Sequence, residues 1–281
     1  MELLPYVSYC VERCASSFEI ADGGGLAAML KAVVRPILNR IVVRERFNDS
    51  RLYTAYVSLF RPEAADNRRK ELRFYEAVVG RNRNLIFDIG ASGGSKAAIF
   101  RQLADHVVCV EPGQKAIEAL NRRFRDDPRI TIVTKGIGAA EGHAALHVFR
   151  DAEPCNTVSD KHGRRDGRQV RIEVITLDRM IQQFGLPHHV KIAVNGSEAA
   201  VLGGLSRPIP IIGFACNLPE FADETVESIN RLISLSPDAR FQYVVGNVRF
   251  GFAASAWLSG TEMVQIVRKS ERAYLEIFCR S

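Results

Sequence analysis

Short runs of apolar and β-branched residues recur along the chain from residue 84 onward. Each run ends in a turn signal, and most are followed by a stretch with apolar residues at three- and four-residue spacing, which is typical of a helix. The runs are NLIFDIG, HVVCVEP, ITIVTKGIG, HVKIAVNG and IPIIGFACN, and the helical stretches include SKAAIFRQLA, QKAIEALNRRF and SEAAVLGGL. Strands that alternate with helices predict a mostly parallel sheet covered on both faces, with ligands beyond the carboxyl ends of its strands.

Two segments depart from this alternation. HAALHVF, a polar loop and RQVRIEVITLDRMIQQFG predict a β excursion followed by a short helix. Near the end of the chain, FQYVVGNVRFGFAASAWLS predicts two strands joined by a Gly-Asn turn. This hairpin would give the sheet an antiparallel edge.

The first 83 residues show helical spacing in pieces instead of strand patterns. A chain of 281 residues is long enough for one large α/β domain with an appendage, and no internal repeat indicates another architecture. We therefore expect a helical extension over residues 1–83 and a single Rossmann-like α/β domain over residues 84–281.

The composition is that of a soluble globular protein, with 47% hydrophobic and 25% charged residues. No apolar stretch approaches the roughly 18 residues of a membrane span, and the N-terminus is a poor signal peptide. The six cysteines are scattered, and Cys10 and Cys14, the one close pair, have no CxxC or HxxxH partner. We expect a cytoplasmic protein with reduced thiols and no metal site.

Positive charge is concentrated near the N-terminus. Residues 26–83 hold thirteen Lys or Arg and six acidic residues, a net charge of +7, whereas the whole chain carries +6. Such a layer could contact anionic lipid, nucleic acid or an acidic substrate. A solvated helix face explains it as well, because no nucleic-acid motif accompanies the charge.

The stretch FDIGASGG places Asp88 at a strand end and Gly90 in the turn that opens a helix. Glycine lets the backbone approach a ligand, but this turn is not G-x-G-x-x-G and is a weak signal alone. Glu111 ends the next strand at about the twenty-residue offset of an acid that binds ribose, although an exposed strand end is the plain alternative. Together they predict an adenosine-type ligand. The acid at position 88 favours S-adenosylmethionine over a dinucleotide, because pyrophosphate needs an uncharged approach.

The ordered series of motifs resembles the FkbM-type family of S-adenosylmethionine-dependent methyltransferases, most of which are similar to O-methyltransferases of sugars, polyketides and glycolipids. The resemblance covers about residues 84–220. It implies a class I methyltransferase fold, a mostly parallel Rossmann-like sheet with an antiparallel C-terminal strand. The matching stretches are LIFDIGASGG, VVCVEP, TKGIGAAEGHAALHVF, NTVSD, VITLDRMIQQFG, VKIAVNGSEAAVLGGL and RPIPIIGFACNLPE.

The resemblance also implies which residues contact the cofactor. The family's D-V-G-A-N-x-G loop falls on residues 88–94, with Ser92 in place of the asparagine; Glu111 takes the ribose position, and KGIG borders the adenine. The implied cofactor-binding residues are Asp88, Gly90, Ala91, Ser92, Gly94, Glu111, Gly136 and Ile137.

The family pattern K-I-D-V-E-G is broken at its two acids. This chain keeps Lys191 but has Ala193 and Asn195 where the family has Asp and Glu. Methyl transfer to a hydroxyl requires alignment of the acceptor and removal of its proton. Alanine cannot accept a proton, and a neutral amide orients a group without acting as a base.

Three interpretations remain open for the chemistry. Another residue supplies the base, alignment alone suffices, or the chain has lost methyl transfer and binds cofactor or a protein partner. His162 has a plain alternative as a solvated loop residue, and Glu198 as a complement to a helix dipole. The candidate catalytic residues are His162, Asp160, Lys191, Asn195 and Glu198. The favoured hypothesis is O-methylation of a hydroxylated small molecule or glycan.

Overall fold

The computed structural model describes residues 62–148, 168–246, 248, 251–271 and 273–281. The chain divides into two compact units, Met1–Pro62 and Glu63–Ser281, and the second holds the folded core analysed below. Most of the predicted N-terminal extension, residues 1–61, lies outside the described residues. The helix α4 (Pro62–Val79) buries Tyr75 and Val79 in the core.

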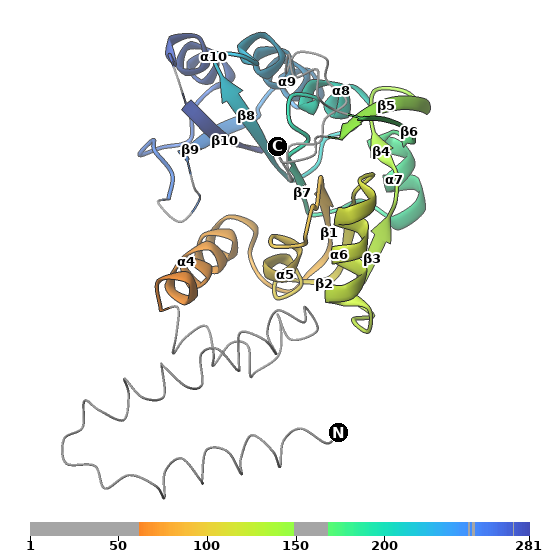
Figure 1. The fold of residues 1–281 in the computed structure, drawn as a ribbon. Coiled ribbons are helices and arrows are strands. Elements are labelled where there is room, and N and C mark those ends of the chain that lie inside the picture. The colour runs from red at the N-terminus through yellow and green to blue at the C-terminus, as the bar shows by residue number, and fades with distance from the viewer. Residues whose placement is uncertain (1–61, 149–167, 247, 249–250, 272) are drawn as a thin grey trace, which may run out of the picture. The chain divides into compact units, whose positions relative to one another are not determined.

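The core is a seven-stranded sheet in the order β3-β2-β1-β7-β8-β10-β9 (Figure 1). Neighbouring strands pair in parallel except β10, which is antiparallel to both β8 and β9. The predicted Rossmann-like sheet with an antiparallel C-terminal strand is confirmed. The strands are β1 (Arg83–Ile89), β2 (Ala104–Val110), β3 (Ile130–Val133), β7 (His189–Ile192), β8 (Ile211–Leu218), β9 (Arg240–Val245) and β10 (Ala273–Arg280).

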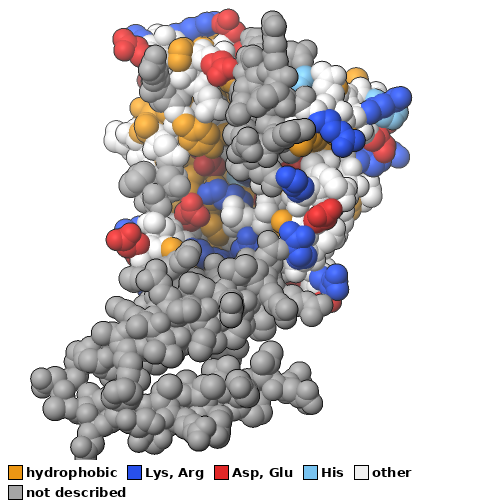
Figure 2. Space-filling view, viewed as in Figure 1, with side chains coloured by type: hydrophobic (Ala, Val, Ile, Leu, Met, Phe, Trp, Pro, Cys, Tyr) orange, Lys and Arg blue, Asp and Glu red, His pale blue; other side chains and the backbone are white. Residues whose placement is uncertain are grey.

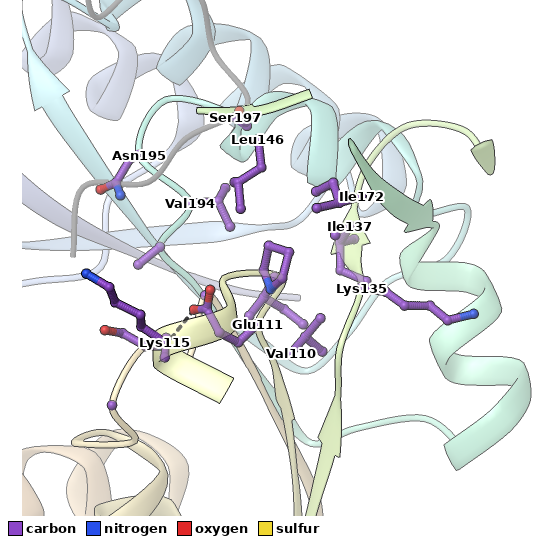
Figure 3. Close-up of a pocket in the computed structure, with 18 of the residues that line it drawn as sticks. Val110, Glu111, Lys115, Lys135, Ile137, Leu146, Ile172, Val194, Asn195 and Ser197 are labelled. Atoms are coloured by element: carbon purple, nitrogen blue, oxygen red, sulfur yellow. Dashed lines mark hydrogen bonds between the residues drawn. The ribbon is translucent and has the colours of Figure 1, made fainter. Parts of the chain in front are cut away.

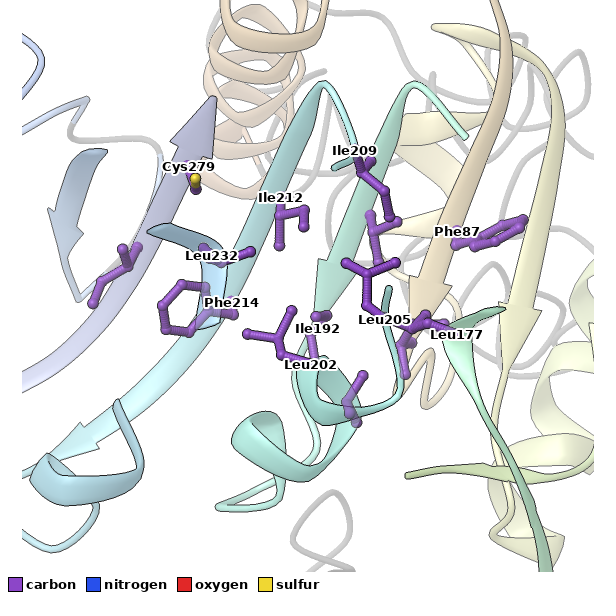
Figure 4. Close-up of a cluster of buried hydrophobic side chains, with 14 of the residues drawn as sticks. Phe87, Leu177, Ile192, Leu202, Leu205, Ile209, Ile212, Phe214, Leu232 and Cys279 are labelled. Atoms are coloured by element: carbon purple, nitrogen blue, oxygen red, sulfur yellow. The ribbon is translucent and has the colours of Figure 1, made fainter. Parts of the chain in front are cut away.

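Helices cover both faces of this sheet, which explains why its strands read as continuous apolar runs. On one face, Tyr75 of α4 packs in a cluster with α5 (Ala97–Phe100) and α6 (Gln114–Phe124). On the other face, Phe87 and its neighbours pack against the remaining helices (Figure 4). These helices are α7 (Leu177–Phe184), α8 (Glu198–Gly203), α9 (Ala222–Leu235) and α10 (Gly260–Lys269). No helix in the described part of the chain has the length and apolar character of a membrane span.

The predicted β excursion forms a separate three-stranded sheet in the order β4-β6-β5. Its strands are β4 (Gly136–Ile137), β5 (Gly142–Val148) and β6 (Arg168–Ile175). β5 and β6 pair antiparallel, and β4 joins β6 in parallel. This small sheet brings Ile137, Leu146 and Ile172 to the carboxyl edge of the main sheet, where the pocket described below lies.

The predicted C-terminal hairpin is wrong. After β9, the described residues of the 246–259 segment form no second strand, and Leu258 makes one isolated bridge to Phe241. The antiparallel strand is β10, which lies between β8 and β9 and not at the edge. The physical reason is burial: Leu275, Ile277 and Phe278 are almost completely buried, as an interior strand requires. The helices α9 and α10 have no counterpart among the predicted elements.

The first residue of β7, His189, is a buried histidine in the middle of the core. Its ring lies 5.4 Å from the Phe100 ring centroid, and its Nδ1 is 3.2 Å from the Ile211 carbonyl oxygen. Burial without a compensating charge lowers the pKa of His189 to about 3. The folded protein therefore holds this ring neutral while the unfolded chain protonates it below about pH 6.5.

This difference predicts a loss of stability in acid. As the pH falls from 7.5 to 5.5, the unfolded chain gains a proton at His189 that the folded chain does not, which costs about 1.4 kcal/mol of unfolding free energy. In the variant His189→Phe, urea unfolding should show a pH dependence weaker by about that amount. The absolute stability of the variant is not the readout. Identical pH dependence in both proteins would contradict the buried neutral ring.

Candidate functional site

A pocket of about 360 Å³ opens at the carboxyl edge of the main sheet (Figure 3). It is bordered by the turn after β1, the end of β2, the start of α6, the small sheet and the end of β7. This is where a doubly wound sheet binds ligands, beyond the carboxyl ends of its central strands. Its volume falls within the roughly 300–1,000 Å³ range of small-molecule sites. The described residues contain no group of three metal-ligating side chains.

Two glycines of the turn after β1 are required for close packing. Gly90 has φ +73°, and a Cβ there would lie 2.0 Å from the carbonyl oxygen of Ala193 at the end of β7. Gly94 has φ +78°, and a Cβ there would lie 2.5 Å from Phe124 Cε2 on α6. Gly90 borders the pocket, whereas Gly94 and Ala91 do not. The turn is thus held against β7 on one side and α6 on the other.

Four backbone amides of this turn, those other than the Gly93 amide, have hydrogen-bond partners within the protein. The amides of Gly90 and Ala91 both donate to the Val110 carbonyl oxygen, at 2.9 and 3.1 Å. The Ser92 amide donates to Glu111 Oε2 at 2.9 Å, and the Gly94 amide donates to the Ala91 carbonyl oxygen. A pyrophosphate group, which is bound through such amides, would find them occupied.

Glu111 links the turns after β1 and β2. The side chain is 7% exposed; Oε2 accepts the Ser92 amide, and Oε1 accepts the Gly113 amide at 2.8 Å. Burial raises the pKa of Glu111, and the two amide donors oppose that shift. Each carboxylate oxygen can accept a second hydrogen bond, so the same acid can still bind hydroxyl groups in the pocket. The alternative prediction from the sequence, that Glu111 is only an exposed residue at a strand end, is therefore wrong.

Asp88 and Lys191 form a buried ion pair below the pocket and do not border it. Asp88 is completely buried, and Lys191 Nζ lies 2.9 Å from its Oδ1. The same ammonium donates to the carbonyl oxygen of Gly90 at 2.8 Å. The predicted contact of Asp88 with a ligand thus has no support in the geometry, because its charge is used to hold Lys191. Lys191, predicted as catalytic, in turn holds the glycine turn.

The far end of the pocket is apolar. Gly136 and Ile137 of β4 border it, as predicted, together with Leu146 and Ile172 of the small sheet (Figure 3). Lys135 borders it as well, and its Nζ lies 2.5 Å from Glu173 Oε1.

The turn after β7 forms the opposite wall and is held by Glu198. Asn195 in this turn has φ +52° and borders the pocket beside Ala193. Glu198 is 7% exposed, and its two oxygens accept the amides of Val194 and Gly196, each at 2.9 Å. Burial raises the pKa of Glu198. Because its oxygens hold the backbone and it does not border the pocket, the geometry gives Glu198 a structural role.

Among the described catalytic candidates, only Asn195 borders the pocket. His162 and Asp160 lie in the segment 149–167, outside the described residues. Sequence reasoning missed Lys115, Leu146 and Ile172 as pocket residues. The strands that carry the last two were expected, but their position against the main sheet follows from long-range packing that no local pattern encodes.

The described part of the basic N-terminal layer is partly neutralised by its own acids. Lys70 pairs with Asp66 at 2.7 Å, Arg81 pairs with Glu76, and Arg83 donates to the Val79 carbonyl oxygen. Residues 26–61 of this layer lie outside the described residues. Contact with an anionic surface through residues 26–83 stays a prediction.

No protein-family model matches the sequence, and no curated protein matches it. Three solved structures illustrate the structural similarities found. An O-methyltransferase from Bacillus cereus in complex with SAH is 14% identical, with TM-score 0.41 over 85% of this chain and 97% of that one. Precorrin-6y C5,15-methyltransferase from Geobacter metallireducens is 11% identical, with TM-score 0.39 over 76% and 88%. A tRNA (m1A58) methyltransferase from Aquifex aeolicus is 14% identical, with TM-score 0.38 over 75% and 68%.

The glycine turn provides a matched pair of variants. In Gly94→Ala, the new methyl group meets Phe124 at a positive φ, so unfolding free energy should fall by about 2 kcal/mol or more. In Gly93→Ala, a Cβ meets nothing within 4 Å, and stability should stay within about 0.5 kcal/mol of the parent. Chemical denaturation of the three proteins measures both values. Equal stability of the two variants would show that Gly94 is not a packing glycine.

Proposed function

We propose that this protein is an S-adenosylmethionine-dependent methyltransferase of the class I fold, related to the FkbM-type family. The observation that carries the proposal is the position of Glu111 between a glycine turn and an apolar slot, at the carboxyl edge of a Rossmann-like sheet. An acid in this position binds ribose hydroxyls in nucleotide-binding proteins of this architecture.

The pocket fits the parts of the cofactor in order. Ile137 and Ile172 at one end provide apolar contacts for the adenine, and Glu111 lies in the middle, where the ribose would be (Figure 3). Asn195 and Lys115 lie at the other end, where they would meet the methionine portion. Bound there, the cofactor supplies an electrophilic methyl group near the end of β7.

A dinucleotide fits the site less well. The turn amides of Gly90, Ala91, Ser92 and Gly94 donate within the protein, so a pyrophosphate would find only the Gly93 amide of this turn as a donor. S-adenosylmethionine has no phosphate and needs none of them. The occupied amides therefore favour the methyl donor over NAD or a related cofactor.

We infer that the acceptor is a hydroxylated small molecule or glycan, and that the reaction is O-methylation. In-line transfer requires the acceptor oxygen, the methyl carbon and the sulfur to be aligned. Asn195 is placed to orient a group at that end of the pocket, and Ala193 leaves space beside it. The competing function, a catalytically silent protein that binds the cofactor or a protein partner, is favoured by the absence of an acid at both positions.

Titration calorimetry tests the cofactor. S-adenosylhomocysteine should bind, NAD should not, and Glu111→Gln should weaken S-adenosylhomocysteine binding about tenfold or more, because an amide cannot keep both backbone donors and accept ribose hydroxyls. Glu118→Gln, an exposed acid on α6, is the matched control and should bind like the parent. No binding of S-adenosylhomocysteine to the parent protein would end the proposal.

A second measurement separates the active enzyme from the silent protein. The intact chain is incubated with S-adenosylmethionine labelled in the methyl group and a panel of sugars and phenols. Transfer of label that disappears in Glu111→Gln supports the methyltransferase. If the cofactor binds but no panel member becomes labelled and no S-adenosylhomocysteine forms, the result favours the silent protein.

A further inference from the structure

Glu276 of β10 is a buried acid that the predicted site did not include. It is 8% exposed, and its Oε1 accepts a hydrogen bond from the Tyr75 hydroxyl of α4 at 2.7 Å. Its other oxygen, Oε2, has no hydrogen-bond partner among the described residues, and it is not one of the fully buried orphan oxygens. One side of this carboxyl group is thus fixed, and the other is open to a ligand.

The sheet register places Glu276 in the row that directly follows the last residue of β7. Ile192 pairs with Phe214 of β8, which pairs with Ile277 of β10. The next row therefore runs from Ala193 through Ala215 to Glu276, and the pair Ala215 and Glu276 is a direct register pair. Side chains in one row point to the same face. Adjacent strands are about 4.8 Å apart, so the backbones of Ala193 and Glu276 are separated by roughly 10 Å.

Small side chains leave this row open between the pocket and Glu276. Ala193 borders the pocket, and Ala215, the next residue in the row, carries one methyl group. Ala215 and Glu276 lie beyond the pocket lining, and neither alanine carries a side chain larger than its methyl group. An acceptor that lies over these two alanines would contact the cofactor at one end and Glu276 at the other.

Several charged and polar groups interact with Glu276. Lys96 Nζ lies 3.2 Å from Glu71 Oε1 and 5.3 Å from the Tyr75 ring centroid. Burial raises the pKa of Glu276 and Glu71 adds to that shift, whereas Lys96, Tyr75 and Lys191 oppose it. Asp88 interacts electrostatically with Tyr75, and Tyr274 interacts electrostatically with Glu276. Figure 2 shows acidic and basic side chains side by side in a hollow at the middle of one face.

We propose that Glu276 is the carboxylate that faces the transferring methyl group and accepts the proton of the acceptor hydroxyl, in place of the acids absent from positions 193 and 195. This inference rests on the proposed function. The acceptor oxygen forms a bond to the methyl carbon, the carbon–sulfur bond breaks with its electron pair passing to sulfur, and the hydroxyl proton passes to Glu276 Oε2. Tyr75 is a positioning residue that holds Oε1.

The charge of the two cofactor forms allows a test that needs no known acceptor. S-adenosylmethionine carries a positive sulfonium, which S-adenosylhomocysteine lacks. A carboxylate near the methyl group should therefore strengthen binding of the first and not of the second. The ratio of the two affinities should rise with pH as Glu276 ionises.

Calorimetry of both ligands between pH 5.5 and 8.5 measures this ratio for the parent and for Glu276→Gln, which can still accept the Tyr75 hydrogen bond. At pH 8.5, the ratio of the affinity for S-adenosylmethionine to that for S-adenosylhomocysteine should be about tenfold lower in the variant than in the parent. The affinity for S-adenosylhomocysteine should be the same in both proteins. Glu227→Gln, an exposed acid of α9 on the opposite face, should match the parent. A ratio that is the same in Glu276→Gln and the parent at every pH overturns the proposal, and so does equal loss of both ligands.

Tyr75→Phe gives a second readout that a purely structural role would not move. Because the hydroxyl favours the ionised carboxyl group, its removal should raise the pH at which the preference for S-adenosylmethionine sets in. An unchanged midpoint contradicts the positioning role of Tyr75. If the parent binds neither ligand, the proposed function itself fails, which is distinct from a normal affinity with no effect of Glu276→Gln.

Discussion

A buried ion pair joins the two central strands directly below the pocket. Asp88 of β1 is completely buried, and the Lys191 ammonium of β7 compensates its charge while donating to the carbonyl oxygen of Gly90. Removing one partner of such a pair costs about 3–5 kcal/mol, because the other charge stays buried. The glycine turn, which forms one wall of the pocket, is therefore fixed from below by the same interaction that ties β1 to β7. The acid that a motif comparison assigns to a ligand serves the scaffold here.

Two further carboxylates extend this principle to the pocket walls. Glu111 accepts hydrogen bonds from two backbone amides and so joins the turns after β1 and β2. Glu198 accepts hydrogen bonds from two backbone amides of the turn after β7. Both are largely buried, and burial raises the pKa of each. Acids that satisfy amides in tight turns allow the backbone to adopt positive φ at residues such as Asn195 without leaving polar groups unpaired. The pocket is consequently preorganised by charge as well as by packing.

Positions 193 and 195 hold no acid, but the row of the sheet that contains Ala193 also contains the acid Glu276. Ala193 and Ala215 lie in one row of the sheet with Glu276, so this row carries two small side chains between the pocket and the acid of β10. The antiparallel strand β10 presents Glu276 opposite Ala215 of β8, in the row that follows the last residue of β7.

The sequence by itself determined the class of the fold, the β excursion and most of the strands, because apolar runs, turn residues and glycine patterns are local signals. The position of Glu111 at a strand end, and the family resemblance for Gly136 and Ile137, pointed to three residues that line the pocket. Local signals misled where a Gly-Asn turn suggested a hairpin, because burial on both faces selected Ala273–Arg280 as the antiparallel strand. Only the tertiary structure decided that Asp88 pairs with Lys191 and that Glu276 lies in the row of Ala193. The role of an ionisable side chain depends on which groups it meets across the sheet, and those groups are far apart along the chain.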